Sequence, residues 1–282
     1  MIDKNKLKKI KIIISDLDGS LLNSEGELGS ETKRIIKELK ALGVQFSFAS
    51  GRLHSALTHL AEELDLKIPL ISLDGSIIKS HPDGDIIFES FVKQKYVIRA
   101  LDFADRFLLN AALCHAEAIY FTENNSVIPR VMDKLGAKYE EVPSYDNYLK
   151  ETLEVVIASD YKENLKYVKD KLSFPHSFGL GLNFYKSQHH KGIYYLELRT
   201  QGASKGKSML KLLANLGIKP EDAVVIGDWY NDISLFETPA FKVALDNSIQ
   251  ELKNKANFVT QKNNDEEGIV EFLELVLKAK KG

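Results

Sequence analysis

The chain has 282 residues, with 38 Lys and Arg residues against 40 Asp and Glu residues, a formal net charge of -2. This near-neutral balance, without a dense basic run, excludes a protein built around nucleic-acid binding. The hydrophobic fraction of 44% and the charged fraction of 28% are typical of a globular protein in water, and two domains are expected at this length.

Cysteine content and hydropathy indicate where the protein works. Cys114 is the only cysteine, so no disulfide can form within the chain, which is typical of a reducing compartment. No apolar run approaches the roughly 20 residues of a membrane span. The basic residues before Lys11 precede only a short apolar stretch, too short for a signal peptide. We therefore predict a cytoplasmic protein that does not bind membranes.

Strand and helix patterns alternate in the first part of the chain. Residues 10–15 are mostly β-branched, which predicts a short buried strand. Ser30 is the expected N-cap of a helix whose apolar residues repeat at helical spacing up to Gly43. The next elements are predicted as a strand at 44–49, a helix at 52–64 and a strand at 68–73. This alternation is typical of βαβ units around a parallel sheet.

The pattern changes in the middle of the chain and returns near its end. Two isoleucine-rich stretches around residues 81–85 predict a hairpin, and residues 91–199 show an α+β pattern. Ser204 is an expected N-cap, and it is followed by a helix to 216, a strand at 223–226, a helix at 232–236 and a strand at 241–244. We predict an α/β fold with a Rossmann-like parallel-sheet core (residues 1–90 and 200–282) and an inserted α+β cap domain (residues 91–199).

The first candidate site is the pair Asp16 and Asp18, followed by Gly19. Side chains two residues apart on an extended strand point the same way. Both carboxylates are therefore expected in the crevice at the strand's carboxyl end, where open α/β sheets bind ligands. Such a pair repels unless one carboxyl is protonated or a cation lies between them. The alternative is that the two aspartates only stabilise a turn.

Two further segments offer groups for an anion. Ser50, Gly51 and Arg52 combine a hydroxyl, a flexible backbone and a helix start after the second strand. Lys205 is expected in the first turn of a helix, where the macrodipole disfavours a positive charge, which hints that the charge serves a ligand. Purely structural roles are the alternative for both segments.

A third segment contains Asp228, Asn231 and Asp232, between a short buried strand and a helix. Carboxylate and amide oxygens are the ligands that Mg²⁺ prefers. Asn231 or Asp232 is alternatively only an N-cap. All these segments are predicted at the same edge of one sheet.

Together these motifs resemble a known family. The segments DLDGS (16–20), SGR (50–52), SKG (204–206) and GDWYND (227–232) resemble those of the haloacid dehalogenase superfamily, in particular its Cof-like sugar-phosphatase branch. The resemblance covers nearly the whole chain and includes residues 243–248 and 265–269. It implies a Mg²⁺-dependent phosphatase of a small phosphorylated metabolite, with sugar phosphates as the expected substrates.

The resemblance also implies roles for individual residues. Asp16 would be the nucleophile that becomes an aspartyl-phosphate, ionised at neutral pH with an ordinary pKa of about 3.9. Asp18 would protonate the leaving oxygen and then deprotonate the attacking water. The metal ligands would be Asp16, the backbone carbonyl of Asp18, Asp228 and, directly or through water, Asp232. The phosphoryl oxygens would be held by Ser50, Gly51, Lys205 and Asn231.

One departure from the family concerns the end of the third strand. Cof-like proteins usually have Asn-Gly there, whereas this chain has Asp74 and Gly75. These two residues and Arg52 are candidate substrate contacts, and the alternative for Asp74 is a turn aspartate without a ligand role.

Two other functions use the same residues. A phosphomutase would pass the phosphoryl group to another sugar hydroxyl instead of water, and a ligand-sensing module would bind without turnover. A nucleotide-binding P-loop is a weaker alternative, because only three residues separate Gly202 from Gly206 where the motif needs four.

Overall fold

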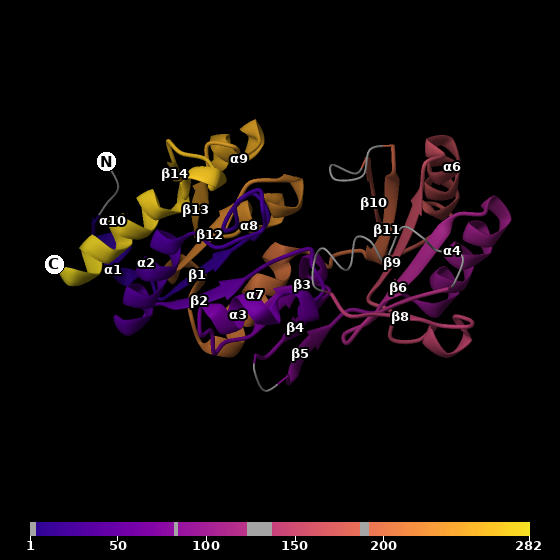
Figure 1. Ribbon diagram of the computed structural model, residues 1–282, viewed down its shortest axis with the longest axis horizontal. Helices are drawn as coiled ribbons and strands as arrows, with labels where there is room; N and C mark the ends of the chain where they lie inside the picture. Colours follow the sequence, from indigo (N-terminus) through magenta and orange to yellow (C-terminus); the bar gives the residue numbers. More distant parts are fainter. Residues whose placement is uncertain (1–3, 82–83, 123–136, 187–191) are drawn as a thin grey trace. The chain divides into compact units, whose positions relative to one another are not determined.

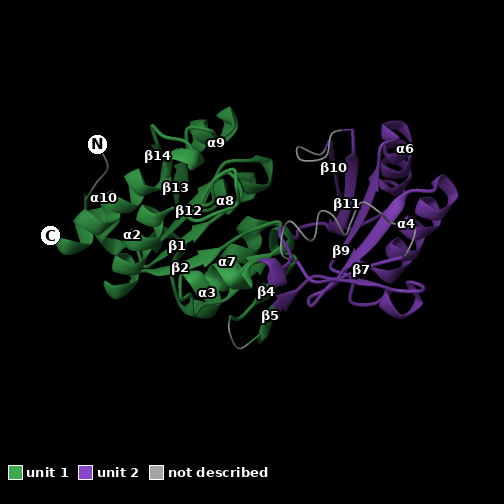
Figure 2. Ribbon diagram, in the orientation of Figure 1, with its two compact units in different colours: residues 1–51, 57–87, 204–282 green, residues 52–56, 88–203 purple. Residues whose placement is uncertain are grey.

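The computed structural model describes residues 4–81, 84–122, 137–186 and 192–282 (Figure 1). The chain divides into two compact units (Figure 2). Unit 1 comprises residues 1–51, 57–87 and 204–282, and unit 2 comprises residues 52–56 and 88–203. The predicted bounds of 1–90, 91–199 and 200–282 differ from this division mainly in that residues 52–56 group with the inserted unit.

A five-stranded parallel sheet forms the centre of unit 1, with the strand order β14-β13-β12-β1-β2. Its strands are β1 (Ile12–Ser15), β2 (Gln45–Phe48), β12 (Ala223–Gly227), β13 (Phe241–Ala244) and β14 (Phe258–Val259). β1 is central, and Ile13 pairs with Phe46 on one side and with Val224 on the other. The predicted α/β fold with a parallel-sheet core is confirmed.

Helices cover this sheet because its side chains are apolar on both faces. Ile12, Ile13 and Ile14 point alternately to the two faces and are all fully buried. Helices α2 and α10 contact each other, as do α1 and α10, and they contribute to the core that contains Ile13. The helices of unit 1 are α1 (Lys4–Lys9), α2 (Ser30–Ala41), α3 (Thr58–Glu63), α7 (Lys205–Leu216), α8 (Ile233–Phe236), α9 (Gln250–Lys255) and α10 (Ile269–Lys281).

The third predicted strand belongs to a separate small sheet and is joined to the main sheet by a β-bridge. β3 (Leu70–Ser72) is bridged to the end of β2 between Ala49 and Ile71, and then pairs with β4 (Ile77–Lys79). β5 (Ile86–Glu89) completes a sheet of order β3-β4-β5, which contains the predicted hairpin. A 3₁₀ turn, Leu73–Gly75, joins β3 to β4.

Unit 2 has a six-stranded mixed sheet of order β10-β11-β9-β6-β7-β8. Helices α4 (Gln94–Phe107) and α6 (Lys162–Leu172) pack against it in one apolar core. The strands are β6 (Asn110–Cys114), β7 (Ile119–Phe121), β8 (Tyr139–Glu141), β9 (Glu154–Ser159), β10 (Leu180–Lys186) and β11 (Tyr194–Thr200). This confirms the predicted α+β character of the insertion, whereas its role as a specificity domain stays a prediction.

Two local predictions are wrong. Ser30 is not the N-cap of α2 but its first residue. The N-cap is Gly29, which has no side chain to cap the helix. The distant Glu267 caps the helix instead, because its Oε2 accepts hydrogen bonds from the backbone N of Thr32 (2.7 Å) and from Thr32 Oγ1 (2.8 Å). The helix predicted at 52–64 begins only at Thr58, after a 3₁₀ turn at His54–Ala56. Within the described ranges, no helix has the length and apolar character needed to cross a membrane.

Candidate active site

Asp16 lies where the central strand of unit 1 ends. Its backbone N donates to Ile226 O (2.9 Å), which extends the pairing of β1 with β12 by one residue. Asp16 is 5% exposed, although it lies at the carboxyl edge of the sheet. Asp18 follows two residues later and is exposed. The predicted nucleophile is therefore shielded, and the predicted acid and base is open to solvent.

Asp228 lies at the end of the neighbouring strand β12, in a loop that Asp232 holds together. Asp232 Oδ2 accepts hydrogen bonds from the backbone N of Asp228 (3.0 Å) and of Trp229 (3.1 Å). Gly227 makes this close packing possible, since a Cβ there would lie 2.6 Å from Asp232 Cβ. The loop thus turns both carboxylates toward the interior, where Asp228 is buried and Asp232 is fully buried.

Three carboxylates meet at this edge of the sheet. Among the residues that the structure describes, Asp16, Asp228 and Asp232 form a group with one oxygen each, all within 4.8 Å of one another. The carboxylate of Asp18 is not part of this group. A set of oxygen donors fits a hard divalent cation, and three buried anions without one would repel each other strongly. The donor chemistry therefore agrees with the predicted metal site.

Lys205 is the first residue of α7, and its ammonium lies among these acids. Its Nζ donates to Asp16 Oδ1 (2.6 Å) and to Asp232 Oδ1 (2.7 Å), and the side chain is completely buried. Burial alone would lower the pKa of Lys205, but the charges of Asp16, Asp232 and Asp74 outweigh it and raise the pKa above its ordinary value. Lys205 is thus a permanent cation beside the predicted nucleophile.

Two acids of the site, Asp16 and Asp228, have raised pKa values. Burial, followed by the charge of Asp232, raises the pKa of Asp16 well above the usual range, while Lys205 opposes this shift. Burial and Asp232 also raise the pKa of Asp228 to about 7. The expectation that Asp16 titrates like a free aspartate is therefore wrong, because it ignored burial and the neighbouring carboxylates. A further cation would favour the ionised forms.

Two small residues of the first motif fit closely against Asp228. Gly19 has a φ of +80°, and a Cβ there would lie 2.4 Å from Asp228 Oδ2. Ser20 Oγ donates to Asp228 Oδ1 (3.0 Å). The DLDGS motif therefore contains the predicted nucleophile, and its Gly19 and Ser20 also supply the space and the donor that set the position of Asp228.

The predicted phosphate-binding groups lie around Asp74. Asn231 Nδ2 donates to Asp74 Oδ1 (2.9 Å), and a Cβ on Gly51 would lie 3.2 Å from the same oxygen. Lys205 Nζ is 3.9 Å from it. Ser50 is buried, and its backbone accepts a hydrogen bond from Asp74 N (2.9 Å).

The two remaining candidate contacts have different positions. Gly75 packs against the start of α7, because a Cβ there would lie 2.4 Å from Ser204 O, and its own carbonyl accepts from Ser208 Oγ (2.6 Å). Arg52 belongs to unit 2. The structure thus brings together Asp16, Gly51, Asp74, Lys205, Asn231, Asp228 and Asp232, all in unit 1.

The loop after β13 forms hydrogen bonds with the loop that contains Gly19 and with the loop that contains Asp228. The sequence does not predict these contacts. Asn247 Nδ2 donates to Gly19 O (2.7 Å), and Asn247 Oδ1 accepts from Asn264 N (3.1 Å). Ser248 Oγ donates to Gly227 O (3.2 Å), and Ile249 N donates to Asp228 O (2.9 Å). The segment belongs to the family resemblance, and nothing in its composition indicates these contacts.

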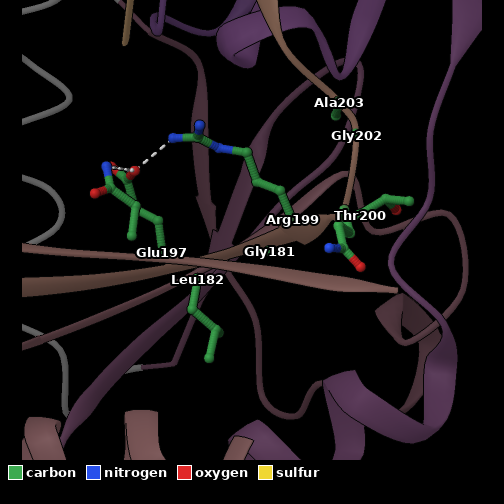
Figure 3. Close-up of a pocket in the computed structure, with 9 residues that line it drawn as sticks. Gly181, Leu182, Glu197, Arg199, Thr200, Gly202 and Ala203 are labelled. Atoms are coloured by element: carbon green, nitrogen blue, oxygen red, sulfur yellow. Dashed lines mark hydrogen bonds and ion pairs between the residues drawn. The ribbon is translucent and has the colours of Figure 1, made fainter. Parts of the chain in front are cut away.

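Unit 2 has a hollow of its own, of about 190 Å³ (Figure 3). Arg199 extends across its wall, with Nε 2.9 Å from Glu154 Oε2 and an ion pair to Glu197. No predicted site residue is among the described residues that line it, which are Gly181, Leu182, Asn183, Glu197, Arg199, Thr200, Gln201, Gly202 and Ala203.

Comparison with known proteins places this chain in a family. The sequence model of the haloacid dehalogenase-like hydrolases matches residues 13–273. The chain belongs to this family, and the predicted superfamily is confirmed.

Two curated relatives match nearly the whole chain. A phosphatase from Bacillus subtilis, YwtE, named for 5-amino-6-(5-phospho-D-ribitylamino)uracil, is 29% identical over 298 residues, covering 95% of this chain and 98% of its own. Phosphatase YwpJ from the same species is 26% identical, covering 95% and 100% of the two chains. The chain is accordingly an enzyme of the phosphatase class within this family.

Solved structures agree in fold. A haloacid dehalogenase-like hydrolase from Bacteroides thetaiotaomicron superposes with a TM-score of 0.83 at 26% identity, covering 94% of this chain and 98% of that one. The subclass IIB sugar phosphatase BT4131, at 22% identity and a TM-score of 0.76, shows the same fold.

Proposed function

We propose that this protein is a Mg²⁺-dependent phosphatase that hydrolyses a small phosphorylated metabolite through an aspartyl-phosphate at Asp16. One observation carries the proposal. Asp16, Asp228 and Asp232 present oxygens within 4.8 Å of one another. The buried Lys205, at the start of α7, donates a hydrogen bond to Asp16. A nucleophile, a set of oxygen donors and a fixed cation are what phosphoryl transfer needs at one point.

The covalent steps use two aspartates. A carboxylate oxygen of Asp16 attacks phosphorus, and the bond between phosphorus and the ester oxygen breaks as Asp18 gives that oxygen a proton. Asp18 then takes a proton from water, whose oxygen attacks the phosphorus of the aspartyl-phosphate. The bond to Asp16 breaks, and inorganic phosphate leaves. The exposure of Asp18 supports this role, since it must reach both the leaving group and water.

The metal would be held by Asp16, Asp228 and the backbone carbonyl of Asp18, with Asp232 directly or through water. When bound, Mg²⁺ supplies positive charge that offsets the repulsion between the carboxylates and a phosphate dianion. Lys205, Asn231, Ser50 and Gly51 would bind the oxygens of the phosphoryl group as its charge redistributes. The inserted unit would select the rest of the substrate.

A sugar phosphate is the proposed substrate class. The resemblance to the Cof-like branch supports it, and so does the relative named for a phosphorylated ribitylamino compound. That relative's substrate therefore belongs in any panel of sugar and nucleotide phosphates.

The test is hydrolysis of p-nitrophenyl phosphate, then of the panel, with Mg²⁺ and with EDTA. Wild-type enzyme is expected to turn over only with Mg²⁺, and Asp16→Asn to abolish turnover with an unchanged circular dichroism spectrum. Asp65→Asn, an exposed aspartate of unit 1, is the matched control and should keep full activity. Comparable turnover by Asp16→Asn would show that Asp16 is not the nucleophile.

The same assay separates the two alternatives. Transfer of the phosphoryl group to a second sugar hydroxyl without release of free phosphate would indicate a phosphomutase. A folded protein inactive on the whole panel with Mg²⁺ would indicate a ligand-sensing module.

A further inference from the structure

The carboxylate of Asp74 takes no part in the chemistry proposed above, yet Asp74 is only 6% exposed and lies among the predicted phosphate-binding groups. It is not one of the three metal-ligand candidates. A buried carboxylate is unfavourable unless it has charged or hydrogen-bonding partners. Three residues near its Oδ1, Gly51, Lys205 and Asn231, come from three separate segments, and each is a predicted phosphate-binding residue.

We propose that Asp74 is a positioning residue that orients Asn231 and Lys205 toward the phosphoryl group, and that it does not contact the substrate. The proposal rests on the phosphatase function proposed above and assigns a further residue to it. It replaces the expectation from the sequence that Asp74 contacts the substrate.

The contact with Asn231 sets the direction of an amide. An ionised carboxylate only accepts hydrogen bonds, so it binds the Nδ2 end of Asn231 and excludes the Oδ1 end. The distance of 2.9 Å between Asn231 Nδ2 and Asp74 Oδ1 agrees with this. Because the amide nitrogen has two N–H groups, one can bind Asp74 while the other faces a phosphoryl oxygen. An asparagine at position 74 would accept either orientation.

The contact with Lys205 acts through charge. Two of the three ammonium protons bind Asp16 and Asp232, at 2.6 and 2.7 Å. Asp74 Oδ1 lies 3.9 Å from Nζ, too far for a hydrogen bond but close for a buried ion pair. Asp74 therefore attracts the ammonium toward the side on which Asn231 lies.

The backbone holds Asp74 in this position at a cost. Leu73 and Asp74 both have left-handed conformations, with φ of 47° and 48°, which residues other than glycine rarely adopt. Asp74 N donates to Ser50 O, and Gly75 packs on the start of the helix that carries Lys205. Strain of this kind persists where the surrounding structure imposes it, often at functional sites.

The test replaces Asp74 by Asn, which keeps the shape and tolerates the left-handed backbone. We expect kcat/KM to fall about 10- to 100-fold, the usual loss when a partner behind a functional group is removed. The factor should be the same for p-nitrophenyl phosphate and for a sugar phosphate, and the inhibition constant of inorganic phosphate should rise. Asp65→Asn is the control, because Asp65 also has a φ of 48° but is exposed on the surface.

A double-mutant cycle with Asn231→Ala separates positioning from a general structural effect. If Asp74 acts partly through Asn231, Asp74→Asn lowers kcat/KM by a much smaller factor in the Asn231→Ala background than in the wild-type background. If the losses in kcat/KM are fully additive, Asp74 does not act through Asn231. If the loss differs about tenfold between p-nitrophenyl phosphate and the sugar phosphate, Asp74 contacts the substrate directly, which overturns the proposal. Wild-type activity in a folded Asp74→Asn variant would overturn the proposal while leaving the phosphatase function intact.

Should Asp74→Asn not fold, Asp74→Gly provides the same comparison, since glycine adopts a φ of 48° without strain. The same losses are expected, and unchanged kinetics would again overturn the proposal. A wild-type enzyme inactive on every ester would instead refute the phosphatase function, and this inference with it.

Discussion

Lys205 Nζ lies 2.6 Å from Asp16 Oδ1, although the two residues are 189 positions apart in the sequence. The contact links the start of α7 to the end of β1, and Asp232 binds the same ammonium at 2.7 Å. Because all three side chains are buried, each charge depends on the others for its stability.

Replacement of Lys205 by Met should therefore affect stability and activity together. Without the ammonium, Asp16 and Asp232 remain buried without their cation, which should lower the free energy of unfolding by about 3–5 kcal/mol in EDTA. Loss of the charge that we propose binds the phosphoryl group should lower kcat about 10²- to 10³-fold. Urea unfolding and steady-state kinetics measure the two effects. Lys207→Met, an exposed lysine of the same helix turn, should change neither, and a Lys205→Met variant as stable as wild type would contradict the interpretation.

Addition of Mg²⁺ should stabilise the protein through Asp228. At about 100 times its dissociation constant, a ligand specific to the folded state adds about 2.7 kcal/mol. In Asp228→Asn this gain should largely disappear, whereas in EDTA the variant should be at least as stable as wild type because one of three neighbouring carboxylates is gone. Thermal unfolding with and without Mg²⁺ measures both. Asp246→Asn, at an exposed aspartate, should respond like wild type.

Two glycines allow close packing and backbone strain to be separated. Gly19 and Gly26 have φ of +80° and +83°, so an Ala at either position should cost about 1–2 kcal/mol. Only at Gly19 would the new Cβ meet a neighbour, Asp228 Oδ2 at 2.4 Å, because nothing lies within 4 Å at Gly26. Gly19→Ala should therefore also weaken the stabilisation by Mg²⁺ and the activity, whereas Gly26→Ala should affect neither. Equal responses would show that Asp228 moves aside without consequence.

Glu267→Ala tests the distant cap of α2. Loss of the carboxylate leaves the N–H of Thr32 without its acceptor, which should destabilise the protein by about 1–2 kcal/mol. The measurement is urea unfolding, with the exposed neighbour in Glu266→Ala as the control. If both variants unfold alike, the contact contributes little.

Cys114 should be chemically inert in the folded protein. Burial, followed by the charge of Glu154, raises the pKa of its thiol well above the ordinary value. A raised pKa means less thiolate at any given pH, and each unit lowers the reactive fraction about tenfold. Alkylation by iodoacetamide at pH 8 should be more than about tenfold slower in the native state than in urea. Rapid native labelling would show that the thiol is accessible.

The site could be predicted from the sequence to the extent that local pattern and strand topology determine it. Asp16 and Asp228 both follow short buried strands, so a parallel sheet brings them to one edge, and the structure shows them there. The N-cap of α2 could not be predicted, because Glu267 supplies the acceptor from a segment that no local pattern connects to Thr32. The pKa of Asp16 depends on burial, which the sequence does not show.

The central position of β1 has a consequence for how the protein is made. β1, which ends just before Asp16, is synthesised early, but Ile12 pairs with Ala223, so one side of β1 stays open until the inserted unit has left the ribosome. The partners of its loop, Asn247 among them, emerge later still. A nascent chain therefore exposes an apolar strand edge for most of its translation, and the surroundings of Asp16 are complete only near the end.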